Sequence, residues 1–80
     1  MERYLATFHT HLAALRTDRT LRAQGIQTQM SPVPRALSSS CGTCVRYEAT
    51  NPHLNAMDTD VESVYKILAQ DHYELHYKND

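Results

Sequence analysis

Four short segments of the chain have the composition or the alternation typical of β-strands, and they limit the folds that the chain can adopt. They cover residues 3–9, 26–30, 44–49 and 73–77. Within the third segment, Val45 and Tyr47 would share one face of a sheet. Arg46 and Glu48 would share the opposite face. A four-stranded sheet is therefore the framework that the sequence predicts.

Two helices are predicted between these strands. Residues 11–24 are rich in helix-forming types, Thr10 can cap their amino end, and Gly25 can take the left-handed conformation that ends a helix. A second helix is predicted to begin after Thr59, because Thr59 and Glu62 have the spacing of a capping box. Four apolar residues then recur at helical spacing, namely Val61, Val64, Tyr65 and Leu68.

The resulting order of elements, β-α-β-β-α-β, predicts a ferredoxin-like α+β fold. In this fold an antiparallel sheet carries both helices on one face, and residues 50–58 would form a polar linker between elements. The 80 residues suffice for one small domain with a thin core, so we expect residues 1–80 to form a single domain. The helix-free face of the sheet would be open to solvent or to a partner.

Charge and hydropathy exclude several classes of protein. The formal net charge is -1 and the basic residues are scattered, which is unlike a nucleic-acid-binding surface. The amino-terminal residues lack the apolar run of a signal peptide, and no segment has the length that spans a bilayer, so we expect no membrane association. We therefore expect a cytoplasmic protein, whose thiols stay reduced unless they are reactive or bound to a metal.

The connection between the second and third predicted strands holds both cysteines of the chain, Cys41 and Cys44. Pro32 and Pro34 fix the backbone at its beginning, so the connection is stiff enough to present a group at a defined place. A stiff surface loop of this kind is typical of a functional site. Cys41 is the candidate reactive group, because it follows a run of three serines and precedes a glycine.

Three neighbours could stabilise a thiolate at Cys41. Ser40 offers a hydroxyl and a backbone amide, and Gly42 can turn successive N–H groups toward one point. Arg35 could add a full positive charge, which makes a cysteine more nucleophilic. The residue-level prediction is therefore a nucleophilic Cys41 supported by Arg35, Ser40 and Gly42.

The first half of the chain resembles a known family of small domains, the "putative selenium/sulfur carrier protein-like" family. The resemblance rests on two stretches in one register, ALRTDRTLRAQGI at residues 14–26 and PVPRALSSSCG at residues 32–42. It implies that Cys41 holds sulfur or selenium as a persulfide or perselenide, with Arg35 and Gly42 in matching motif positions. The chain departs from the usual pattern at three positions, Asp18, Ala36 and Cys44.

The predicted function is therefore that of a carrier rather than a turnover enzyme, with no cofactor. The Cys41 thiolate would attack a donor persulfide, such as that of a cysteine desulfurase, and later surrender the terminal atom to an acceptor protein. We expect Cys44 to be accessible but secondary, resolving the Cys41 persulfide by forming a disulfide. The sequence leaves open whether the cargo is sulfur or selenium, and whether the domain forms a homodimer.

Three other classes remain as alternatives. CGTC resembles the motif of dithiol redox proteins, although a predicted strand follows it where those proteins have a helix. A metal-binding module would use both cysteines, but the five histidines provide no second pair at ligand spacing. The third class is an interaction module that uses the open face of the sheet. In a separate alternative, Cys41 is an inert structural thiol.

Overall fold

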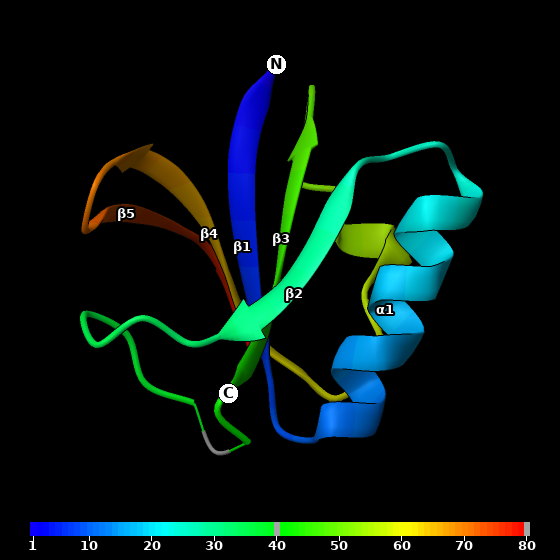
Figure 1. Cartoon of the computed structure of the whole chain (residues 1–80), viewed down its shortest axis with the longest axis horizontal. Coiled ribbons are helices and arrows are strands. Elements are labelled where there is room, and N and C mark those ends of the chain that lie inside the picture. Colours follow the sequence, from blue (N-terminus) through cyan, green and yellow to red (C-terminus); the bar gives the residue numbers. More distant parts are fainter. Residues whose placement is uncertain (40, 80) are drawn as a thin grey trace.

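The computed structural model describes residues 1–39 and 41–79. In this part of the chain, a five-stranded antiparallel sheet carries one α-helix on one of its faces (Figure 1). The elements along the chain are β1 (Glu2–Phe8), α1 (His11–Ala23), β2 (Thr28–Pro32), β3 (Thr43–Ala49), a 3-10 helix η1 (Leu54–Ala56), β4 (Val61–Ala69) and β5 (His72–Lys78). The strands lie in the order β2-β3-β1-β4-β5, which makes β1 the central strand.

The helix α1 begins at His11, as the sequence predicts, and ends at Ala23, one residue before the predicted end at Gln24. The Thr10 side chain accepts a hydrogen bond from the Ala13 backbone N–H at 3.1 Å, which caps the amino end. Gly25 follows the carboxyl end with φ of +80°, the left-handed conformation expected there. The prediction for the first helix is therefore confirmed.

A buried carboxylate connects α1 to β2. Asp18 is 6% exposed, forms an ion pair with Arg22 at 3.1 Å, and accepts a 2.6 Å hydrogen bond from the Thr28 hydroxyl. A carboxylate removed from water in this way is stable only when it is paired and hydrogen-bonded. The contact fixes the start of β2 on the helix, and β2 leads into the connection that holds Cys41.

The predicted second helix is wrong, because its residues form the strand β4. The β4 strand pairs with β1 on one side and with β5 on the other, so the backbone N–H and C=O groups of β4 form hydrogen bonds within the sheet. Val61 and Val64 are buried as the helical pattern requires, but Leu68 is 55% exposed. The ferredoxin-like β-α-β-β-α-β prediction is therefore wrong, and a single α-helix lies on the sheet within the described residues.

Two local features replace the predicted helix cap. The Asp58 carboxylate accepts a hydrogen bond from the Asp60 backbone N–H at 3.0 Å, which turns the chain into β4. Glu62, expected to complete a capping box, instead lies close to His9. At the other end, residues 70 and 71 form a two-residue turn into β5, and Asp71 takes φ of +60°.

Both faces of the sheet contain buried residues. The face toward α1 holds the main core, which includes Tyr4, Ala6, Phe8, Val45, Tyr47 and Val64. On the other face, Leu5, Thr7 and Cys44 have no exposed surface. In Figure 1 the connection between β2 and β3 and the β4–β5 hairpin both extend to the side of the sheet away from α1. The helix-free face is therefore partly covered, and not fully open as the sequence predicts.

Candidate functional site

Two backbone hydrogen bonds shape the connection between β2 and β3. One joins its two ends, and the other forms a turn near its start. The Val33 N–H donates to the Gly42 carbonyl at 3.0 Å, and the Leu37 N–H donates to the Pro34 carbonyl at 3.0 Å. Gly42 has φ of +74°, a conformation that favours glycine over any residue with a Cβ. This geometry returns the chain to the sheet directly after Cys41.

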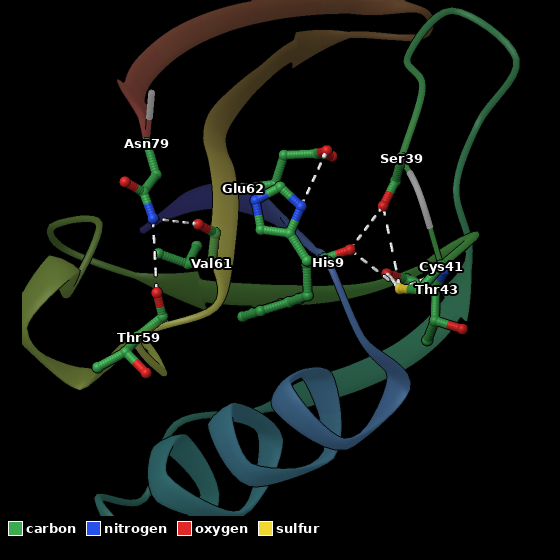
Figure 2. A network of polar contacts seen from close by, with 9 residues as sticks. His9, Ser39, Cys41, Thr43, Thr59, Val61, Glu62 and Asn79 are labelled. Carbon is green, nitrogen blue, oxygen red and sulfur yellow. Dashed lines mark hydrogen bonds and ion pairs between the residues drawn. The ribbon is translucent and has the colours of Figure 1, made fainter.

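Cys41 is fixed against the carboxyl end of β1, as Figure 2 shows. Its Sγ donates a hydrogen bond to the Phe8 carbonyl at 3.0 Å and accepts one from the Thr43 N–H at 3.5 Å. The Ser39 hydroxyl donates to the same Phe8 carbonyl at 2.8 Å and lies 3.9 Å from Sγ. Cys41 itself is partly exposed. The thiol therefore has a defined position while remaining within reach of a reactant.

These contacts can serve both protonation states of the sulfur. The neutral thiol donates its proton to the Phe8 carbonyl. The Thr43 N–H already points at the sulfur, and the Ser39 hydroxyl needs only a rotation to donate to it. Donors of this kind stabilise a negative charge on the sulfur once the proton has left.

Two histidines, which the sequence suggests only as metal ligands, make contacts near the end of β1 and the start of β3. His9 follows Phe8 directly, and its Nδ1 lies 3.6 Å from a carboxylate oxygen of Glu62 (Figure 2). His11 Nδ1 lies 3.4 Å from the Thr43 hydroxyl. The sequence carries no signal for this arrangement, because it arises only where the end of β1 meets the connection between β2 and β3.

The structure unites some of the predicted site residues and separates others. Gly42 adjoins Cys41 with the expected positive φ. Arg35 is exposed in the turn after Pro34, and no hydrogen bond or ion pair in the described part of the chain joins it to Cys41. Ser40 lies outside the described residues. The donors that do contact Cys41 are Ser39 and Thr43, which no sequence pattern identifies as site residues.

The prediction that Cys44 is accessible is wrong. Cys44 has no exposed surface, and its Sγ lies 3.3 Å from the Ser31 hydroxyl and 3.6 Å from the Pro32 carbonyl. Burial raises the pKa of the Cys44 thiol, although the Ser31 hydrogen bond and the Arg46 charge act in the opposite direction. Cys44 does lie on the face opposite Val45, but it is in the middle strand of three, opposite Ser31 of β2 and Thr7 of β1. Both cysteines are free thiols.

Two further findings concern other classes of protein. Among the described residues, no group of three or more His, Cys, Asp or Glu side chains is arranged to hold a metal ion. In the same part of the chain, no helix has both the length and the apolar character needed to cross a membrane.

The fold and the site together define a small α+β domain that presents one hydrogen-bonded thiol from a closed loop. Residues 3–74 match the family described as "Putative Se/S carrier protein-like", and the chain belongs to this family. The resemblance seen in the first half of the sequence is thereby confirmed. The chain is also 33% identical over 45 residues to "Uncharacterized protein YtiA" of Escherichia coli (strain K12). That match covers 56% of this chain and 53% of YtiA. No solved structure matches the chain.

Proposed function

We propose that the protein carries sulfur or selenium on Cys41 and passes it from a donor protein to an acceptor protein. The observation that carries this proposal is the environment of the Cys41 sulfur, which is partly exposed yet contacted by the Thr43 N–H and close to the Ser39 hydroxyl. The family description supports the same role. A carrier needs a thiol that takes its cargo from a donor and then holds it until the acceptor binds. A thiol with a fixed position and nearby hydrogen-bond donors suits both steps.

The transfer balances without an external oxidant. The Cys41 thiol loses its proton, and its sulfur attacks the outer sulfur of a donor persulfide. A new S–S bond forms on Cys41, the S–S bond of the donor breaks, and the donor leaves as a thiolate that takes up a proton. Attack by an acceptor nucleophile on the terminal sulfur then releases the Cys41 thiolate. Selenium in the terminal position would follow the same steps.

The donor in this proposal is a cysteine desulfurase or another protein that forms a persulfide, and the acceptor is a second protein. Such traffic requires a reducing compartment such as the cytoplasm, where a free thiol persists. Burial favours a neutral, unreactive Cys44, so we assign the carrying role to Cys41 alone. Any reaction of Cys44 with a Cys41 persulfide would require local opening of β3 from its neighbours.

Intact mass spectrometry tests the proposal. After incubation with a cysteine desulfurase and cysteine, the protein should gain about 32 Da, one sulfur atom, and lose it on reduction. Cys41→Ser should abolish the gain, whereas Cys44→Ala should retain it with an unchanged lifetime. Cys44→Ala is the matched control because it also removes one thiol and leaves the Cys41 contacts intact.

Two results would contradict the proposal. Equal loss of loading in both variants would show that the two thiols act as one unit, and a dithiol mechanism would replace the carrier. Failure of the unaltered protein to gain mass from several persulfide donors would remove the carrier function altogether.

A further inference from the structure

The Phe8 carbonyl, at the carboxyl end of β1, binds two side chains of the connection between β2 and β3. It accepts a hydrogen bond from the Cys41 thiol at 3.0 Å and another from the Ser39 hydroxyl at 2.8 Å (Figure 2). Because β1 is the central strand, these two contacts join the connection to the middle of the sheet. One of them uses the proton that Cys41 must lose before its sulfur can hold any cargo.

The Phe8 carbonyl has a fixed position in the fold. The N–H of the same peptide unit, which belongs to His9, donates to the Asp60 carbonyl at 3.0 Å. The Phe8 side chain has no exposed surface and packs in the core. Since the peptide unit is planar, a rotation of the carbonyl would also break the hydrogen bond of the His9 N–H. Any adjustment to cargo on Cys41 must therefore come from the connection and not from β1.

Cargo on Cys41 removes its hydrogen bond to Phe8. In a persulfide the inner sulfur is bonded to carbon and to the terminal sulfur, and it carries neither a proton nor a charge. The S–S bond is about 2 Å long, so the terminal sulfur cannot fit between Sγ and a carbonyl oxygen 3.0 Å away. The inner sulfur resembles a thioether, a weak acceptor, so its hydrogen bond from the Thr43 N–H also weakens.

We propose that loading releases Cys41 from the Phe8 carbonyl and opens the connection between β2 and β3 at its base. The Val33 N–H donates to the Gly42 carbonyl at 3.0 Å, and Gly42 directly follows Cys41, so a displacement of Cys41 weakens this closing hydrogen bond. An acceptor protein that binds the open form then distinguishes the loaded carrier from the empty one. This use of the opening rests on the proposed carrier function, whereas the opening itself requires only a modified Cys41 sulfur.

Amide hydrogen exchange of a methylthiolated protein tests the opening without a persulfide donor. The probe is methyl methanethiosulfonate. The Cys41 thiolate attacks its methylthio sulfur, a mixed disulfide forms on Cys41, and methanesulfinate leaves, so the inner sulfur acquires the same two bonds as in a persulfide. The full-length protein carries Cys44→Ala, which leaves Cys41 as its one thiol.

We expect the Val33 and Thr43 amides to exchange about tenfold faster after the modification, because loss of one hydrogen bond shifts an opening equilibrium by about that factor. NMR spectroscopy measures these rates residue by residue. The Ile26 N–H, which donates to the Leu21 carbonyl at 3.0 Å beyond the carboxyl end of α1, should exchange at an unchanged rate.

Two variants separate the lost proton from the added bulk. Cys41→Ser keeps a hydroxyl that can donate to the Phe8 carbonyl, whereas Cys41→Ala has no donor and adds no bulk. The Val33 amide should therefore exchange about tenfold faster in Cys41→Ala than in Cys41→Ser. Equal rates in these two variants would overturn the proposal.

The remaining results also decide it. Unchanged exchange at Val33 and Thr43 after methylthiolation would overturn the proposal. Equal acceleration at Ile26 would overturn it as well, because the whole domain and not the connection would then open. Failure of a desulfurase to load Cys41 is a separate result, since the reagent modifies Cys41 without a partner protein.

Discussion

At the scale of single residues, two glycines adopt nearly the same left-handed conformation in different places. Gly42 has φ of +74° and Gly25 has φ of +80°, and no heavy atom lies within 4 Å of the position that a Cβ would take at either one. An added methyl group would therefore meet open space at both positions, and only the backbone conformation would resist it. The two residues form a matched pair for separating stability from function.

Gly42→Ala and Gly25→Ala should each destabilise the protein by about 1 to 2 kcal/mol, the cost of a left-handed residue with a Cβ. Urea unfolding measures this cost. Only Gly42→Ala should also change the rate at which Cys41 reacts with iodoacetamide, because Gly42 joins Cys41 to the Thr43 N–H that contacts its sulfur. Equal alkylation rates in both variants would show that the turn does not position the thiol.

Cys44 shows at the same scale how burial decides the chemistry of a thiol. Sequence spacing places it three residues from Cys41, which suggests a dithiol. In the fold it lies between β1 and β2, without exposed surface, and burial raises its pKa. Two cysteines that are close in the sequence therefore differ in exposure, in hydrogen-bond partners and in the reactions open to them.

At the scale of elements, β4 is the segment for which the sequence pattern predicts the wrong structure, a helix instead of a strand. Its apolar residues recur at a helical spacing, yet the segment is also rich in β-branched and aromatic residues, as β-strands are. The strand has neighbours on both sides, β1 and β5, and these long-range hydrogen bonds outweigh the local helical preference. A helix after Thr59 would not form the hydrogen bonds that β4 makes with β1 and β5.

Two substitutions distinguish the strand from the helix. Val64 has no exposed surface, so Val64→Ala should cost about 2 kcal/mol of the free energy of unfolding. Leu68 is 55% exposed, so Leu68→Thr should change it by less than about 0.5 kcal/mol, since threonine also suits a strand. In a helix both residues would face the core, and both variants would be strongly destabilised. Urea unfolding of the two variants provides the measurement.

At the scale of the whole molecule, stability should decline in alkaline solution. Burial raises the pKa of the Cys44 thiol and of the Tyr47 phenol, whose hydroxyl donates to the Pro52 carbonyl. Both groups then release their protons at a higher pH in the folded chain than in the unfolded chain. Their contributions are fully present below the unfolded-state pKa values, about 8.5 and about 10, and are lost as the pH rises through the folded-state values.

Thermal unfolding between pH 7 and pH 11 should therefore show a midpoint that begins to fall near pH 8.5 and falls more steeply above pH 10. Tyr47→Phe should lower the midpoint at pH 7 by about 5 °C, through loss of about 1 kcal/mol, and should lack the steeper decline. Tyr73→Phe, at a partly exposed position, should keep the steeper decline. A midpoint that stays constant up to pH 10.5 would contradict the burial argument.

Features with local causes could be predicted from the order of the residues. Thr10 and Gly25 limit α1 through contacts within a few residues, the alternation of Val45 and Tyr47 predicts the faces of β3, and the motif around Cys41 identifies the family. Features that depend on distant partners could not be predicted in this way and emerge from the fold. These are the strand β4, the burial of Cys44, and the contact of Cys41 with the end of β1. The physical reason is that each of them arises from hydrogen bonds and burial between residues far apart in the chain, which no local pattern of side chains records.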